Sequence, residues 1–464
     1  MSRKTMPRSL LRYFIVVLAT ASILSIVQPL SAQNRVDNDA VLGEFLLLLL
    51  GSEEGKRQAL AFVDTNWQPG FTPMLMEVLT FNEDTAFAPP LVDLLEKKTG
   101  RSFGFNIEQW QQWLWNRPAE VHPAYAEFKS ALYGLIDERF ESYFGQDRPV
   151  SIRLDEVLWG GVKQDGIPPL RDPVMVDAAD ADYLADDNIV FGLAVNGDVR
   201  AYPKRILAWH EMFVDEVGGV PVAGVYCTLC GTMILYGTEV DGKNHALGTS
   251  GFLYRSNKLM YDQATNSLWN TIWGKPVVGP LAATDISLPR MSVVTTTWGE
   301  WRRRHPQTSV LSLSTGHTRD YAEGAAYREY FATDELMFQV PEVDGRLNNK
   351  DEVLGLLLPG YPEQPTAISV AYLADHPLYQ DRIGELDFVV LTDTSGASRV
   401  YESGGVAFSG WDGNSQLTDK AGGAWRLDEA KLEAADGRQL YRLPAHRAFW
   451  FGWYSAYSHT RLVN

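Results

Sequence analysis

Residues 217–236 read VGGVPVAGVYCTLCGTMILY, and this stretch is the most informative part of the sequence for fold and site. Two apolar runs, Val220–Tyr226 and Thr232–Tyr236, predict neighbouring strands. The turn between them carries Cys227 and Cys230, the only two cysteines among 464 residues. Cysteines at positions i and i+3 bring two sulfurs close enough to bind one soft metal ion or to close a small disulfide.

The same strand-like texture continues through residues 150–464. Apolar runs bounded by Gly, Asp and Asn predict further strands at Ile189–Val195, Phe388–Thr392 and Arg399–Tyr401. Turn signals suited to hairpins stand at Asn196-Gly197, Asp241-Gly242 and Asp412-Gly413. We therefore predict one β-rich domain over residues 150–464.

An internal repeat is expected within this domain, with halves at about 190–312 and 354–463. VGGVPVAGVYC at 217–227 aligns with IGELDFVVLTD at 383–393, and MYDQATNSLW at 260–269 aligns with LTDKAGGAW at 417–425. Leu-Pro recurs at 288–289 and 443–444, and WGEW at 298–301 recurs as WFGW at 450–453. The order is kept, so we predict two β-rich halves packed as one pseudo-symmetric unit.

The two halves differ at the thiols. Asp393 falls opposite Cys227 and Gly396 opposite Cys230, and no His-Glu pair matches His210-Glu211. The thiols and His210 are therefore expected in one half only, which indicates a site rather than a part of the repeated scaffold.

Residues 37–148 have a helical pattern instead. Helices are predicted to open at Val41 and to span Phe71–Leu79, Pro90–Lys98 and Ile107–Trp115, with Gly100 as a stop signal. Paired short helices of this kind resemble HEAT-like repeats, and a helical cap on the main domain is the alternative. The predicted fold class is α+β, with a helical (HEAT-like) module followed by the duplicated β-rich domain.

The N-terminus is typical of an export signal. Arg3, Lys4, Arg8 and Arg12 precede an apolar segment, Tyr13 to Val27, and cleavage is expected after Ala32. Residues 1–32 are thus predicted to be a signal peptide, and the mature chain to be periplasmic or extracellular without a membrane span. An uncleaved anchor helix is the alternative, although the run is short for a bilayer span.

The net charge of −17 fits a soluble protein and argues against nucleic acid as a partner, since phosphates would be repelled. The helical module is a candidate surface for binding a protein partner. There is no Gly-rich phosphate loop, no His-Glu-x-x-His and no nucleophile elbow.

Several segments together resemble an uncharacterised prokaryotic family, domain of unknown function 3179, over roughly residues 150–464. The matching segments are AYP at 201–203, WHE at 209–211, YCTLCG at 226–231, GFLYRSN at 251–257, MYD at 260–262, SLW at 267–269 and TGHTRDY at 315–321. The family commonly has proline where this chain has Thr228. The resemblance implies a fold unit and a site, and it implies no activity.

For the site, the leading hypothesis is a transition-metal centre, copper or zinc, with Cys227, Cys230 and His210 as ligands. Met260, Asp262 or water would complete it. The alternatives are a redox-active disulfide and an inert structural disulfide. Glu211 could orient His210 or act as a general base near metal-bound water, so it is the candidate catalytic residue, and the sequence does not decide whether the chain is an enzyme.

A pocket is expected to be lined by a second set of polar residues, namely Tyr254, Asn257, Asp262, His317 and Arg319. Asp262 has a counterpart in Asp419, which favours a structural turn, and Trp269 and Trp425 are predicted as core anchors. The 14 tryptophans also allow a third function, a non-catalytic interaction or glycan-binding protein.

Overall fold

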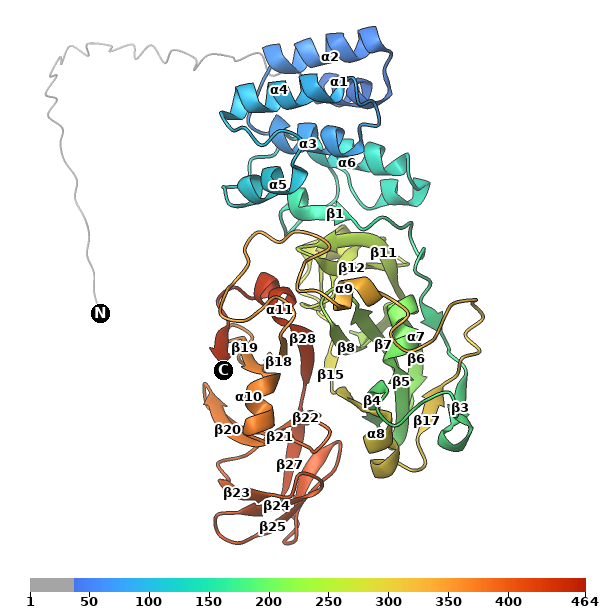
Figure 1. Cartoon of the computed structure of the whole chain (residues 1–464), viewed down its shortest axis with the longest axis vertical. Coiled ribbons are helices and arrows are strands. Elements are labelled where there is room, and N and C mark those ends of the chain that lie inside the picture. The colour runs from blue at the N-terminus through green and yellow to red at the C-terminus, as the bar shows by residue number, and fades with distance from the viewer. Residues whose placement is uncertain (1–36) are drawn as a thin grey trace, which may run out of the picture. The chain divides into compact units, whose positions relative to one another are not determined.

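The computed structural model describes residues 37–464, of which 38–464 form one compact unit (Figure 1). The predicted signal peptide therefore lies outside the described residues. The N-terminal part of this unit is helical and the remainder is β-rich, as the sequence predicts. Within residues 37–464, no helix has the length and apolarity needed to cross a bilayer.

Six helices make up the N-terminal part: α1 Asn38–Leu50, α2 Glu53–Thr65, α3 Phe71–Phe81, α4 Ala88–Thr99, α5 Ile107–Trp115 and α6 Tyr125–Gly134. The helix predicted at 107–115 has those bounds, and α4 ends at Gly100, whose positive φ of 67° lets the chain turn away. Side chains such as Phe45, Phe71 and Phe128 pack edge to face between the helices. Short 3₁₀ turns follow at Glu138–Ser142 and Leu154–Glu156.

Three sheets form the first part of the β-rich region. One contains β1 Val157–Trp159, β11 Leu247–Tyr254, β12 Asn257–Asp262, β13 Leu268–Asn270 and β14 Lys275–Val278. The second has the order β15 Arg290–Met291, β8 Thr232–Gly237, β7 Val220–Cys227, β6 Met212–Val217 and β2 Leu170–Arg171. The third has the order β16 Val294–Thr297, β4 Ile189–Val195, β5 Asp198–Pro203, β17 Ser309–Leu311 and β3 Met175–Asp177. A small hairpin, β9 Glu239–Val240 and β10 Lys243–Asn244, and two 3₁₀ turns, Ala178–Asp180 and Pro280–Ala283, complete this part.

Two sheets form the C-terminal part. The smaller has the order β28 Ala445–Phe449, β18 Glu352–Leu356, β19 Thr366–Ser369 and β29 Arg461–Val463. The larger has eight strands in the order β20 Leu378–Ile383, β21 Leu386–Thr392, β22 Ser398–Glu402, β27 Gln439–Leu443, β26 Lys431–Ala434, β25 Ala424–Leu427, β24 Gln416–Asp419 and β23 Phe408–Trp411. Its first and last strands are joined by the side chain of Gln380, which donates to the carbonyl oxygen of Phe408 and accepts from its N–H.

Two of these sheets share one connectivity. Strand β4 pairs antiparallel with β16 and β5, and β5 pairs parallel with β17. Strand β18 likewise pairs antiparallel with β28 and β19, and β19 pairs parallel with β29. Helices occupy matching places: α7 Lys204–His210 and α10 Val370–Asp375 follow the second strand, while α8 Trp298–Arg304 and α11 Trp450–Ala456 precede the last. The duplication of the sequence stays a prediction.

A histidine also stands at the corresponding place in the C-terminal sheet. His210 ends α7 two residues before β6, and His376 follows α10 two residues before β20. Pro377 stands where Glu211 does, so Glu211 and the two cysteines, but not His210, distinguish the first half from the second.

Candidate thiol site

The predicted hairpin carries the cysteines. Cys227 is the last residue of β7 and pairs with Thr232, the first of β8, so residues 228–231 form the turn. Gly231 has a φ of 57°, and a Cβ there would lie 2.8 Å from the ring of Phe449, so both the backbone conformation and the close packing require glycine. The two cysteines are free, with their Sγ atoms 3.0 Å apart.

Asn257 from β12 contacts the second cysteine. Its Oδ1 lies 2.9 Å from Cys230 Sγ, and the carbonyl oxygen of Ser256 lies 3.4 Å from the same sulfur. The Asn257 amide nitrogen donates to Ser455 Oγ of α11, which fixes the orientation of the side chain. Asn257, expected in a pocket, is therefore a direct neighbour of the thiols, where it accepts a hydrogen bond from Cys230.

A buried ion pair lies beside the thiol turn. Glu211 adopts a φ of 56° at the end of α7, and this turn of the chain directs its carboxylate to Lys258 of β12, with which it forms an ion pair. Thr228 Oγ1, within the thiol turn, donates to Glu211 Oε1 at 2.8 Å, and Tyr327 donates to the same oxygen at 3.1 Å. The carboxylate is thus tied to the turn that holds both sulfurs.

The pKa values of the two thiols are shifted in opposite directions. Burial opposes ionisation of Cys227, but the hydrogen bond with Cys230, the backbone N–H of Lys258 and the Lys258 charge together hold its pKa below the ordinary value. Burial and the neighbouring Cys227 raise the pKa of Cys230 well above it. Cys227 is therefore the thiol that ionises first.

His210 lies in a different environment from the sulfurs. Its Nδ1 is 2.8 Å from the carbonyl oxygen of Pro168, and its Nε2 is 2.5 Å from the hydroxyl of Tyr321, so both ring nitrogens have partners. Burial lowers the pKa of His210 to about 4, assisted by the charge of the nearby Arg319. His317 packs against it with ring centroids 5.2 Å apart. His210, His317 and Arg319 thus form a second polar group.

The other expected pocket residues do not join either group. Asp262 accepts from the backbone N–H groups of Ala264 and Thr265 and lies 2.7 Å from His245 Nδ1, which is the structural turn that its counterpart Asp419 indicates. Tyr254 lines a separate cleft. In residues 37–464, no three His, Cys, Asp or Glu side chains are grouped so as to hold a metal ion. The Cys227–Cys230–His210 metal set stays a prediction.

A long segment covers the thiols. Residues 312–351 connect β17 to β18 and contain one short helix, α9 Arg328–Phe331; we call this segment the strap. Tyr330 donates to the carbonyl oxygen of Leu229 at 2.8 Å, and Ser256 donates to that of Phe338 at 2.7 Å. Under the strap, Cys227 is 2% exposed and Cys230 fully buried.

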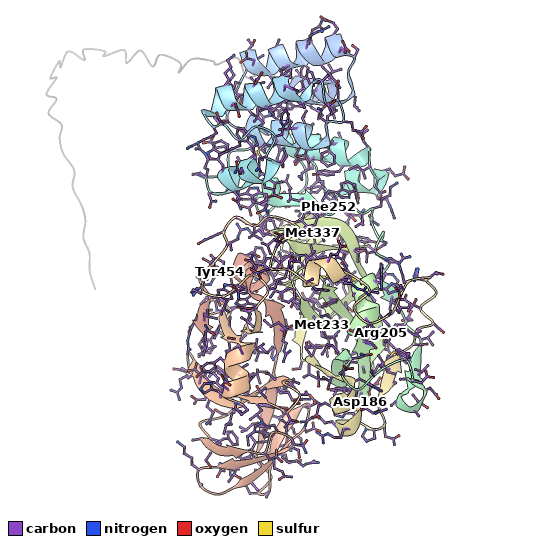
Figure 2. All side chains as sticks on the ribbon, in the orientation of Figure 1. Asp186, Arg205, Met233, Phe252, Met337 and Tyr454 are labelled. Carbon is purple, nitrogen blue, oxygen red and sulfur yellow. The ribbon has the colours of Figure 1, made fainter. Side chains whose placement is uncertain are left out.

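A cavity of about 70 Å³ lies between the strap and the ion pair. Its polar residues are Glu211, Lys258, Tyr327 and Thr249, and Leu229, Phe252 and Phe338 are among its apolar residues. Met337 of the strap, which Figure 2 labels, also lines the cavity and is 51% exposed, so the cavity borders solvent there. Through Leu229 the cavity reaches one of the two residues between the cysteines.

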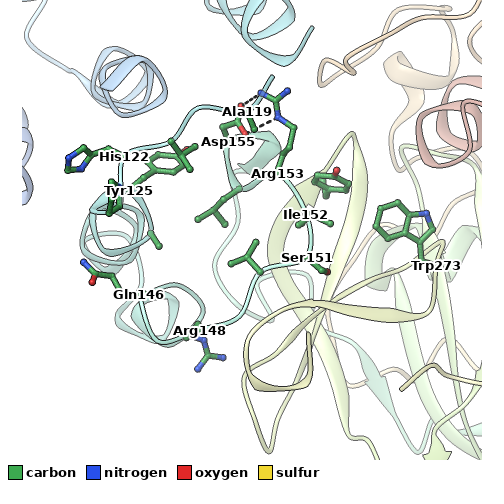
Figure 3. Close-up of a pocket in the computed structure, with 17 residues that line it drawn as sticks. Ala119, His122, Tyr125, Gln146, Arg148, Ser151, Ile152, Arg153, Asp155 and Trp273 are labelled. Atoms are coloured by element: carbon green, nitrogen blue, oxygen red, sulfur yellow. Dashed lines mark hydrogen bonds and ion pairs between the residues drawn. The ribbon is translucent and has the colours of Figure 1, made fainter. Parts of the chain in front are cut away.

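A larger cleft, of about 770 Å³, lies between the helical part and the first strands. Tyr125 and Trp273 stand on opposite sides of it, and Arg153 beside it pairs with Asp155 (Figure 3). Arg153 also donates to the carbonyl oxygens of Leu114 and Arg117. This cleft holds neither thiol.

Three participants escaped sequence reasoning. Lys258 lies inside β12, between the segments GFLYRSN and MYD, and every residue of this strand is buried. A lysine within a strand of this kind was the signal that could have identified it. Thr228 stands out in the sequence only as a departure from the family's usual proline, yet its hydroxyl binds Glu211. Tyr327 lies 116 residues from Glu211, and no local pattern predicts that contact.

The family model described as protein of unknown function (DUF3179) matches residues 164–460. The chain therefore belongs to this family, and the thiol turn, the ion pair and the strap all lie inside the matched region. Neither the curated proteins nor the solved structures contain a match.

Proposed function

We propose that this chain is a thiol-disulfide redox protein whose reactive groups are Cys227 and Cys230. The observation that carries the proposal is the separation of 3.0 Å between the two sulfurs. A disulfide needs ~2.05 Å, whereas two bonds of ~2.3 Å to a tetrahedral metal ion would hold the sulfurs roughly 3.7 Å apart. The observed spacing is closer than a shared metal favours, and a small approach would bring the sulfurs to bonding distance.

The unequal acidities assign a role to each thiol. Cys227, with the lowered pKa, is the nucleophile, and Cys230, which keeps its proton and can donate its one S–H to Asn257 or to the Cys227 thiolate, is the resolving thiol. Lys258 favours the thiolate of Cys227, whereas the negative charge of Glu211, which is paired with Lys258, opposes it.

The reaction is a two-electron exchange with a disulfide of a protein or small molecule. The Cys227 thiolate attacks one sulfur of the substrate, forming a mixed disulfide and releasing a substrate thiolate that takes up a proton. Cys230 then loses its proton and attacks Cys227 Sγ, which forms the internal disulfide and releases the second substrate thiol. The chain is oxidised and the substrate is reduced; the reverse direction oxidises a dithiol.

Metal handling is the competing function, with copper or zinc as the expected metal. Both ring nitrogens of His210 already have hydrogen-bond partners. A metal site formed by Cys227, Cys230 and His210 is therefore less well supported than the redox function. Export to a periplasmic or extracellular compartment, as the N-terminal sequence indicates, would suit either function. The cleft in Figure 3 is the observation that favours the third possibility, an interaction protein.

The deciding experiment combines a redox titration with metal analysis. Because the chain has two cysteines, alkylation followed by mass measurement counts its thiols without ambiguity. We expect reversible loss of two thiols in defined thiol-disulfide buffers, and accumulation of a mixed disulfide in Cys230→Ser but not in Cys227→Ser. The redox function would be refuted if the thiols never oxidise. It would also be refuted if the chain holds a stoichiometric metal that is lost only when both Cys227 and Cys230 are replaced by serine.

A further inference from the structure

A second, smaller cavity, of about 10 Å³, lies where β8 and β15 meet β28. It has room for about one water-sized particle. Its lining is apolar except for two side chains, Arg290 of β15 and His446 of β28. The apolar lining residues are Ile234, Leu235, Met291, Val293, Leu357, Pro444 and Ala445.

Arg290 lacks a counter-ion within residues 37–464, since no carboxylate oxygen lies within 4.0 Å of its guanidinium nitrogens. Its Nη2 donates to the carbonyl oxygen of Ile272 and lies 3.4 Å from the hydroxyl of Tyr457, both neutral groups. Its Nη1 is buried without a hydrogen-bond partner among the described residues. A buried donor on a charged group without a partner is costly, so a ligand is expected there.

His446 presents a second donor to the same cavity. Its Nε2 is also buried and has no partner among the described residues. Burial, with the charge of Arg290, lowers the pKa of His446 to about 3, so the ring is neutral near pH 7. A neutral ring carries one N–H, and Nε2 can be the nitrogen that holds it.

We propose that this cavity binds one monovalent anion of about the size of chloride, between Arg290 Nη1 and His446 Nε2. Arg290 and His446 both line this cavity, each has one buried nitrogen without a partner among the described residues, and the arginine charge repels cations. A water molecule would satisfy the donors but leave the charge uncompensated, and the volume excludes sulfate and phosphate. The site is independent of the thiol function and joins strands of the two parts of the β-rich region.

The solution test is thermal unfolding of the full chain in sodium chloride, sodium bromide and sodium gluconate at equal ionic strength. We expect a Tm higher by a few degrees in chloride and bromide, rising with the logarithm of the halide concentration, because the ligand binds the folded state alone. Arg290→Gln should abolish this difference. Arg302→Gln, which removes an exposed arginine paired with Asp186, should retain it.

Diffraction from bromide-soaked crystals of the unaltered chain supplies the second readout and does not depend on any variant folding. The expected result is an anomalous peak between Arg290 and His446. Equal Tm values in chloride and gluconate would overturn the proposal. If the crystals then show no bromide peak, the cavity holds water. If they show a bromide peak, the site takes an adventitious ion only. If Arg290→Gln does not fold, His446→Phe replaces it in the solution test.

Discussion

At the scale of single residues, the pKa of Cys227 is lowered by its hydrogen bond with Cys230 and then by Lys258, and the charge of Glu211 opposes this effect. Lys258 is buried against Glu211, and its charge and backbone N–H both favour the Cys227 thiolate. We predict that the double variant Lys258→Met/Glu211→Gln, which leaves no buried charge alone, raises the pKa of Cys227. Reaction with iodoacetamide near pH 7, at reagent concentrations low enough that opening of the strap does not limit the rate, should then slow several-fold, because the thiolate is the reacting form.

The matched control is Lys243→Met, which removes an exposed lysine from β10. It should leave the alkylation rate unchanged. An unchanged rate in the double variant as well would show that Lys258 does not set the acidity of Cys227.

His210 predicts how stability depends on pH. Its folded-state pKa of about 4 lies below its ordinary value of 6.5, so the proton favours the unfolded chain. The stabilisation by neutral His210 is complete above about pH 6.5 and is lost as the pH falls towards 4, by at most a few kcal/mol. Urea unfolding at pH 7 and pH 4.5 should therefore show a smaller acid loss in His210→Gln than in the unaltered chain. The same acid loss in both would contradict this account.

At the scale of elements, the thiol turn depends on Gly231. Alanine there must adopt a φ of 57° and also displace the ring of Phe449. Gly242 in the β9–β10 hairpin has a φ of 72° and open space within 4 Å of where a Cβ would stand, so Gly242→Ala has the backbone cost without the clash. We predict that Gly231→Ala lowers the free energy of unfolding by about 1–3 kcal/mol more than Gly242→Ala does. Denaturant midpoints measure the difference, and equal losses would show that Phe449 yields freely.

The strap predicts how the thiols react in the folded protein. Since both are buried beneath it, a reagent must wait for an opening, and the alkylation rate should reach a ceiling as reagent concentration rises. Tyr330→Phe removes the hydrogen bond to Leu229 and should raise that ceiling. Tyr441→Phe, at an exposed position on β27, should not. A rate that stays linear in reagent would mean that the thiols are reached without opening.

Elements were predictable from sequence where local pattern determines them. Ile107–Trp115 and Ile189–Val195 have the predicted bounds because helix caps, turn residues and apolar spacing act over a few neighbours. The thiol turn was predictable for the same reason. The strap was not, because its contacts to Leu229 and Ser256 join residues 101 and 82 positions apart and leave no periodic trace.

The same distinction applies to the site. Cys227 and Cys230 are predictable as a pair and contact Asn257, whereas His210 was grouped with the thiols because the second half, as aligned by sequence, lacks all three. The positive φ of Glu211 separates neighbouring side chains, sending the carboxylate to Lys258 while His210 binds Tyr321. A one-residue change of backbone direction of this kind has no reliable signal in a single sequence.

At the scale of the whole molecule, the thiol site is assembled from distant segments. The turn comes from β7–β8, the lysine and asparagine from β12, the glutamate from the end of α7, and the cover from the strap. Ser455 of α11, in the C-terminal part, holds Asn257 in place. The site therefore requires the first part of the β-rich region, the strap and α11 to be folded together.

In the eight-stranded sheet, two hydrogen bonds between Gln380 and Phe408 join the first and last strands, and we call this pair the Gln380 clamp. It affects how copies of this chain can meet. An open sheet presents unpaired N–H and C=O groups that can template a strand from another molecule. Here the N–H and C=O of Phe408 on the last strand are already bonded to an amide from the first. That position cannot recruit a foreign strand, so the clamp protects a β-rich chain against growth into fibrils at this edge.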